Sequence, residues 1–307
     1  MPKMNVIRSA SIQSDAATVF SKLNDFNHWP AWSPWLIMEP EVEVTVADDA
    51  KYYEWKGNRT GEGNMTITGE QENTQIDYDL TFLKPWKSKA KVSFRLEENG
   101  DHTNVTWTMD SSLPFFMFWM KKMMEGFVGM DYERGLNLLK DYVEKGEIES
   151  KLEFNGIQKF PGADYIGIKT SCPIAEIGEK MQADFGRLHE FLASSKESSV
   201  TGAYSIYHDW NMKKMECTYT ACVGVDKHPT SLPADIIAGS IPETNIHVVR
   251  HVGAYTHIGG AWAAQMNMQR GKEFAMKRGI HPFEWYHNMP DEVEPKDLIT
   301  DICFAAK

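Results

Sequence analysis

Glu284 is the side chain in this sequence best suited to chemistry. It lies between Phe283 and Trp285 in a strand-like segment, where an ionised carboxylate is costly unless it faces water, a partner or a ligand. In an apolar cleft its pKa would rise, and the carboxylate could act as a general base on water. Tyr255 would then orient the leaving group or the nucleophile. The alternative is a strand glutamate that simply faces solvent.

Four aromatic residues are candidate walls of a binding site around Glu284: Tyr207, Tyr255, Trp262 and Trp285. Aromatic faces carry negative potential and suit flat or cationic ligands. Taken singly, an aromatic residue at helical spacing such as Trp262 is more often part of a core, because pockets are few in a protein. Tyr255 is the stronger candidate, since it lies at a strand-to-helix junction from which its hydroxyl could reach a cleft.

Metal and cofactor chemistry find little support in the sequence. The histidines do not reproduce a zinc spacing such as H-E-x-x-H, and the four cysteines show no C-x-x-C pair. The sequence also contains no glycine-rich phosphate loop and no G-x-S-x-G motif. We therefore expect no metal site and no cofactor, so an enzyme built on Glu284 would be a metal-independent hydrolase.

An internal repeat in the second half of the chain predicts where Glu284 lies in the fold. Residues 204–209, YSIYHD, align with residues 283–288, FEWYHN, so that Ser205 is the counterpart of Glu284. Each copy reads strand, helix, strand, strand. Two such copies should pair their sheets about a pseudo-twofold axis and leave a cleft where they meet, with a single acid in it.

Length and charge limit the classes of function. The 307 residues suit two domains. The net charge of −11 disfavours a phosphate backbone or an anionic membrane surface as the principal partner. We find no run of eighteen apolar residues and no apolar signal core, so we expect a cytoplasmic protein without a membrane span.

The first half of the chain predicts a curved antiparallel sheet closed by one long helix. Residues 4–11 suit a strand, and residues 41–110 contain about six further strand-like segments. Between them, residues 28–35, HWPAWSPW, are broken by prolines and should not form a regular helix. A helical stripe then continues to about residue 144. Such a sheet and helix enclose a cavity.

Two aromatic segments bear on this cavity. Trp29, Trp32 and Trp35 either line its mouth or plug the sheet beside the first helices. Residues 115–122, FFMFWMKK, could touch a membrane, but we expect them to open the closing helix with their apolar side chains pointing into the cavity.

The first half resembles a known superfamily. The carrying residues are WPAWSPW at 29–35, the turn GEGNM at 61–65 and GLNLLK at 135–140. Over about residues 3–146 the chain resembles the polyketide-cyclase and START-like (SRPBCC, helix-grip) superfamily. The resemblance implies a fold that holds hydrophobic ligands. It implies no reaction, because the superfamily contains carriers, sensors and a few enzymes.

The second half resembles a different family over about residues 154–307. The carrying residues are VGAY at 252–255 leading into GAW at 260–262, then FEWYHNMP at 283–290 and DLITDI at 297–302. They resemble the GyrI-like effector-binding domain of bacterial transcription activators. The resemblance implies multidrug recognition, with the glutamate at the position of Glu284 facing the ligand pocket and cationic or polar drug groups. Some members of the fold hydrolyse strained, reactive small molecules.

We therefore predict an α+β protein of two domains, a helix-grip domain at 1–147 and a duplicated β-α-β-β effector-binding domain at 152–307. The predicted function is binding or sensing of small hydrophobic or cationic molecules. Activators of the resembling family join their effector domain to a helix-turn-helix, and here the helix-grip domain takes that position, so we expect no direct nucleic-acid contact. The alternatives are a detoxifying hydrolase of lipophilic electrophiles with Glu284 as general base, and a protein-binding inhibitor.

Overall fold

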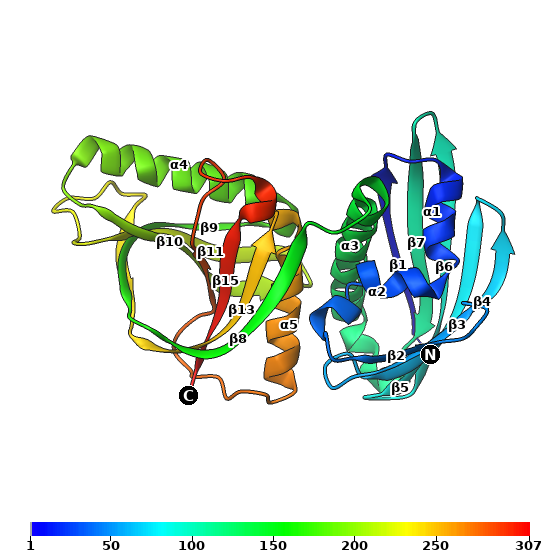
Figure 1. Cartoon of the computed structure of the whole chain (residues 1–307). Coiled ribbons are helices and arrows are strands. Elements are labelled where there is room, and N and C mark those ends of the chain that lie inside the picture. The colour runs from blue at the N-terminus through cyan, green and yellow to red at the C-terminus, as the bar shows by residue number, and fades with distance from the viewer. Residues whose placement is uncertain (1) are drawn as a thin grey trace. The chain divides into compact units, whose positions relative to one another are not determined.

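The computed structural model describes residues 2–307 and divides into two compact units, the first ending at Ser150 and the second beginning at Lys151. Each unit contains one antiparallel sheet with its own helices (Figure 1), which confirms the predicted α+β class. Within the described residues, the structure contains no helix with the length and apolar character needed to cross a membrane.

The first unit is built on a seven-stranded sheet with the strand order β1-β7-β6-β5-β4-β3-β2. The strands are β1 (Lys3–Ile12), β2 (Glu43–Val46), β3 (Tyr52–Lys56), β4 (Glu62–Gln71), β5 (Gln75–Lys84), β6 (Ser88–Asn99) and β7 (His102–Ser112). The helices are α1 (Ala16–Leu23), η1 (Phe26–His28), α2 (Trp29–Trp32), η2 (Leu36–Met38), η3 (Phe115–Met120) and α3 (Lys121–Lys145).

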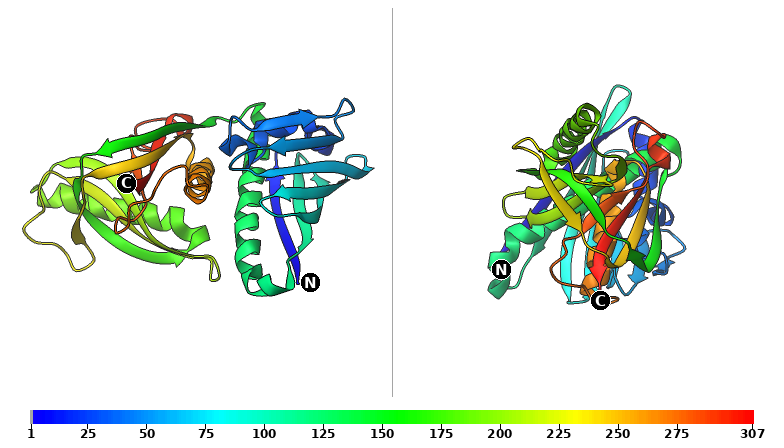
Figure 2. Two further views of the ribbon diagram at one scale, coloured as in Figure 1. Left: turned by 90° about the horizontal axis from the view of Figure 1, so that it is seen from below. Right: turned by 90° about the vertical axis from the view of Figure 1, so that its left-hand side faces the viewer.

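Helix α3 packs along β1 and covers the inner face of this sheet (Figure 2). Alternate residues of β7 point inward, as expected for a strand with one buried face. One of them, Trp107, stacks on Tyr132 of α3 with their ring centroids 3.8 Å apart. Gly135 allows this approach, because a Cβ there would lie 2.7 Å from the Trp107 ring. The helix-grip arrangement is confirmed.

Two predictions for this unit differ from the structure. Residues 28–35 form no continuous helix, as predicted, but Trp29–Trp32 form one α-helical turn that ends at the extended Ser33, because a proline in the first turn of a helix lacks only an N–H that has no helical partner. The segment that contains Phe115 and Phe116 does not point into the cavity, since these two side chains are 78% and 75% exposed. The pairing of β7 with β1 ends at Ser112, so η3 lies beyond the last strand pair.

The second unit is built on an eight-stranded, strongly curved sheet with the order β12-β9-β11-β10-β14-β15-β13-β8 (Figure 1). The strands are β8 (Ser150–Phe160), β9 (Ala163–Pro173), β10 (Val200–Asn211), β11 (Glu216–Val225), β12 (Ile237–Ile241), β13 (Thr244–Gly253), β14 (Phe283–Tyr286) and β15 (Ile299–Ala306). The helices are η4 (Ile174–Glu176), α4 (Ile177–Ser195), η5 (Tyr255–His257), α5 (Gly259–Arg270) and η6 (Pro295–Asp297).

The predicted duplication is confirmed by the order of these elements. One copy is β9-α4-β10-β11 and the other is β13-α5-β14-β15. In the sheet the two copies meet at the antiparallel pair of β10 with β14. Ser205 lies directly opposite Glu284 in this pair, so the two residues that align in the repeat face each other where the copies join.

Candidate functional site

Glu284 lies at the centre of the second unit. It belongs to the short strand β14, its neighbours β10 and β15 pair with it on either side, and it is 3% exposed. Because side chains alternate along a strand, Glu284 and Tyr286 share one face. Helix α4 reaches this face through Met181, and α5 reaches it through Trp262.

Both carboxylate oxygens of Glu284 accept hydrogen bonds from aromatic side chains. The indole Nε1 of Trp262 donates to Oε1 at 2.6 Å. The hydroxyl of Tyr207 donates to Oε2 at 3.0 Å, and that of Tyr286 donates to the same oxygen at 2.5 Å. All three donors are neutral. Burial raises the pKa of Glu284, although these three hydrogen bonds offset part of the rise.

Tyr255 and Met181 complete the surroundings of the carboxylate. The Tyr255 ring lies 5.9 Å from that of Tyr286. Burial and the nearby Glu284 raise the pKa of Tyr255 to about 12. The Met181 sulfur lies 3.4 Å from the Tyr286 hydroxyl and 3.3 Å from the Ser205 hydroxyl. Tyr255 and Met181 are only half-buried, so on this side the surroundings of the carboxylate reach the surface of the domain.

The predicted aromatic walls are only partly brought together. Tyr207 and Trp262 meet edge to face at 4.8 Å beside Glu284. Trp285 instead lies on the opposite face of β14, where its ring is 5.3 Å from Phe160. The reason is the alternation of a strand, which sends adjacent residues to opposite faces.

Two further site residues were not predicted. Tyr286 contacts the carboxylate directly, and the period of two along β14 could have identified it. Trp210 stacks on Tyr207 at 5.4 Å and lies 6.1 Å from Trp262. A β-bulge between Tyr207 and Asp209 shifts the alternation, so residues 207 and 210 contact each other although their spacing of three predicts opposite faces.

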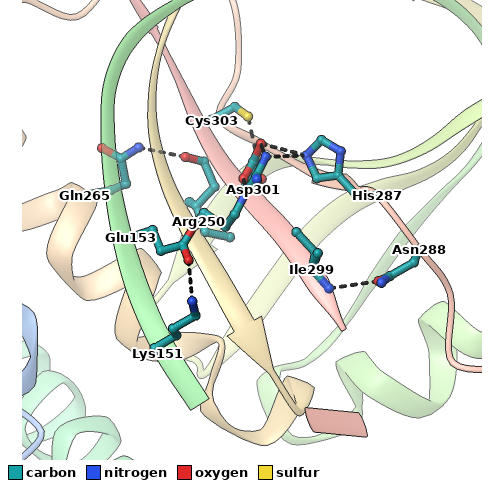
Figure 3. A network of polar contacts seen from close by, with 10 residues as sticks. Lys151, Glu153, Arg250, Gln265, His287, Asn288, Ile299, Asp301 and Cys303 are labelled. Atoms are coloured by element: carbon teal, nitrogen blue, oxygen red, sulfur yellow. Dashed lines mark hydrogen bonds and ion pairs between the residues drawn. The ribbon is translucent and has the colours of Figure 1, made fainter. Parts of the chain in front are cut away.

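A second buried acid, Asp301, has a different environment (Figure 3). Arg250 donates to it from Nε at 2.7 Å and from Nη2 at 3.0 Å, and His287 Nε2 lies 2.7 Å from Oδ2. Burial favours the neutral acid, but the hydrogen bonds from His287 and Arg250 outweigh it and lower the pKa of Asp301. Asp301 pairs with Trp285 across the strands. It is therefore a carboxylate held by a cation, whereas Glu284 is held by neutral groups.

The first unit contains a cavity of about 70 Å³ between the sheet and α3. Most of its lining is aromatic or aliphatic, including Trp29, Trp35, Trp55, Phe82, Trp107 and Tyr132. Trp32 is fully buried and packs against Phe94 and Trp107. The cavity is small beside the 300–1,000 Å³ that is typical of sites for drug-sized ligands.

No group of three or more potential metal ligands is found among the histidine, cysteine, aspartate and glutamate side chains of residues 2–307. The buried Asp301 has one imidazole and one guanidinium as neighbours. A guanidinium donates hydrogen bonds and does not ligate metals.

Comparison with known families agrees with the two units. Residues 3–144 match the family model for polyketide cyclase / dehydrase and lipid transport, and residues 156–307 match that for the GyrI-like small molecule binding domain. No curated protein sequence matches this chain.

Several solved structures are similar in part. A complex of EcmrR with DNA shares 15% identity over 63% of this chain and 72% of its own, with a TM-score of 0.44. The EcmrR C-terminal domain shares 18% identity over 52% of this chain and 99% of its own, with a TM-score of 0.43. The Aha1 dimer from Colwellia psychrerythraea shares 17% identity over 47% of this chain and 99% of its own, with a TM-score of 0.36.

Proposed function

We propose that this chain, which joins a polyketide cyclase-type domain to a GyrI-like small molecule binding domain, binds lipophilic organic cations around Glu284 and acts as their sensor or carrier in the cytoplasm. The observation that carries the proposal is a fully buried carboxylate whose hydrogen-bond donors are all neutral. Four buried, unpaired cysteines suit a reducing compartment. The net charge of −11 favours cationic ligands over nucleic acid.

The energetic argument rests on the contrast between the two buried acids. A buried charge is costly unless a counter-charge and hydrogen bonds compensate it. Asp301 has its counter-charge in Arg250, so it needs no ligand. Glu284 has hydrogen bonds without a counter-charge, and its raised pKa expresses that deficit. A cation that binds next to Glu284 would supply the missing counter-charge.

The side chains around Glu284 suit such a ligand. Trp262, Tyr207 and Trp210 form an aromatic group next to the carboxylate, and aromatic faces attract cations. Because Glu284 is 3% exposed, entry requires movement of the side chains around it, and Tyr255 and Met181 are two such neighbours that also reach solvent. Methionine is suited to this movement because its unbranched side chain repacks readily.

The test is calorimetric titration of the full chain with tetraphenylphosphonium and with a neutral aromatic compound of similar size. Wild type should prefer the cation, and Glu284→Gln should bind it at least tenfold more weakly, a loss of about 1.4 kcal/mol or more. Glutamine fits the site, because its oxygen can accept from Trp262 while its amide group donates to the tyrosine hydroxyls.

The matched control is Glu190→Gln on α4, an exposed position. It removes the same charge from the chain without touching the site, so it should bind tetraphenylphosphonium as wild type does. Equal affinity of wild type and Glu284→Gln for the cation would show that the carboxylate does not recognise charge, and the proposal would be abandoned.

One observation favours a hydrolase as the second candidate. The raised pKa of Glu284 would suit a general base, which takes a proton from water while the oxygen attacks a strained electrophile and the opened bond receives the proton. The same variants distinguish the two functions when product formation is followed with lipophilic epoxides. Turnover by wild type that is lost in Glu284→Gln supports the hydrolase, and binding without product refutes it.

A further inference from the structure

The first domain carries a group of exposed aromatic side chains, which we call the aromatic ridge: Phe115, Phe116, Phe118 and Trp119 of η3. They are 78%, 75%, 61% and 62% exposed, respectively. Exposed apolar groups of this size mark a surface that contacts a partner or a membrane. The family match and the cavity leave this surface unexplained.

The loop between β5 and β6 adds to the ridge. Ala90 near the start of β6 pairs with Ser111 near the end of β7, so this loop and η3 lie at the same end of the sheet. The loop exposes Trp86 by 50%, and Leu83, near the end of β5, is 41% exposed. Aromatic and aliphatic groups from two segments thus form one end of the domain.

The charge at this end is opposite to that of the chain. The cationic side chains next to the ridge and the loop are Lys84, Lys87, Lys89, Lys91, Lys121 and Lys122. Three of them pair with acids, Lys84 with Glu62, Lys91 with Asp79 and Lys121 with Glu125. Lys87, Lys89 and Lys122 are exposed, and in a protein with a net charge of −11 they supply positive charge beside the apolar ridge.

We propose that the aromatic ridge docks the protein on an anionic lipid bilayer. Tryptophan and phenylalanine insert at the level of the headgroups, while flanking lysines pair with anionic lipids. Every ridge side chain is more than 60% exposed, which describes a convex surface. A bilayer accepts a convex apolar surface directly, whereas a protein partner needs a matching groove.

The aromatic ridge lies near the cavity of the first domain, and this position indicates what docking would achieve. Phe82 of β5 lines the cavity of the first domain, and the next residue, Leu83, is one of the exposed side chains at this end. A domain docked by this end brings its cavity wall close to the lipid, where apolar molecules concentrate. This step needs no contribution from Glu284, so the docking proposal is independent of the proposed cation site.

The test is sedimentation of the full chain with phosphatidylcholine vesicles that contain or lack phosphatidylserine. We expect binding to the anionic vesicles that weakens as sodium chloride is added. Phe116→Ser/Trp119→Ser should abolish it. Lys87→Gln/Lys122→Gln, at two exposed positions, should weaken it about thirtyfold, because each lysine near an anionic surface contributes about 1 kcal/mol.

Matched control variants lie in the second domain. Ile157→Ser/Ile237→Ser removes two exposed apolar side chains, and Lys213→Gln/Lys214→Gln removes two adjacent exposed lysines. Both should bind vesicles as wild type does, and circular dichroism should show that every variant is folded.

Three outcomes would overturn the docking proposal. Wild type that stays in the supernatant with anionic vesicles at low salt would refute it, as would undiminished binding by Phe116→Ser/Trp119→Ser. Gel filtration that shows a wild-type dimer, lost in that variant, without vesicle binding would assign the ridge to self-association instead.

Discussion

The Arg250–Asp301 pair predicts an asymmetric response to mutation. The Asp301 side chain is 2% exposed and that of Arg250 is 29% exposed. Arg250→Ala strands a buried carboxylate with His287 as its remaining polar partner from the network. Asp301→Asn leaves a guanidinium that can turn towards water. We therefore expect Arg250→Ala to destabilise the second domain more than Asp301→Asn does.

The magnitudes follow from the burial of each partner. Removing one member of a buried ion pair costs about 3–5 kcal/mol when the other stays buried and charged. His287 still contacts Asp301 at 2.7 Å, so we expect about 3 kcal/mol for Arg250→Ala. Asparagine keeps an oxygen that can accept a hydrogen bond from Arg250. Asp301→Asn should therefore lose only the additional strength that the negative charge gives these hydrogen bonds, about 1–2 kcal/mol.

Thiol labelling provides an assay that reads the second domain alone. All four cysteines, at positions 172, 217, 222 and 303, lie in this domain and are buried. Pulsed alkylation across a urea titration therefore reports its unfolding without interference from the first domain. If Asp301→Asn costs as much free energy as Arg250→Ala, or if Arg250→Ala costs less than about 1 kcal/mol, the burial argument is wrong.

Three further predictions concern stability. Glu284→Gln should stabilise the second domain at pH 7, because burial raises the folded-state pKa of Glu284 above its ordinary value of 4.5. The free-energy cost of burying the ionised carboxylate is absent below pH 4.5 and grows by about 1.4 kcal/mol per pH unit up to the pKa of the folded state. Urea titrations of the variant and wild type should therefore coincide in acid. Gly135→Ala should destabilise the first domain by roughly 1–2 kcal/mol, since its Cβ would lie 2.7 Å from Trp107. Gly186→Ala on α4, whose Cβ would meet no described atom within 4 Å, should instead stabilise by about 0.5–1 kcal/mol in thermal melts.

Much of the fold could be predicted because it follows from local patterns. The duplicated sequence made Ser205 the counterpart of Glu284, and the structure brings these two residues together in the pair of β10 with β14. The change from strand alternation to a helical stripe likewise identified α3. These features depend on periodicity and repetition, which a sequence displays directly.

The site was less predictable because it depends on details that a sequence does not display. The bulge after Tyr207 brings Trp210 to the aromatic group, and a register shift leaves no clear mark in the residues themselves. The exposure of Phe116 follows from where the last strand pair ends, which is set by three-dimensional pairing. The alternation that separates Trp285 from Glu284 follows from the period of two along β14, which the sequence displays directly.

The cross-strand pair of Ser205 with Glu284 also determines how many negative charges lie where the two copies of the repeat meet. Had both copies of the repeat kept the acid, two carboxylates would face each other across one strand pair and repel. They would share a proton or hold a divalent ion between them. With serine in one copy, the duplicated fold presents one negative charge on an otherwise symmetric joint. The two copies of the repeat therefore differ in charge where they meet, and one monovalent cation can neutralise the single carboxylate.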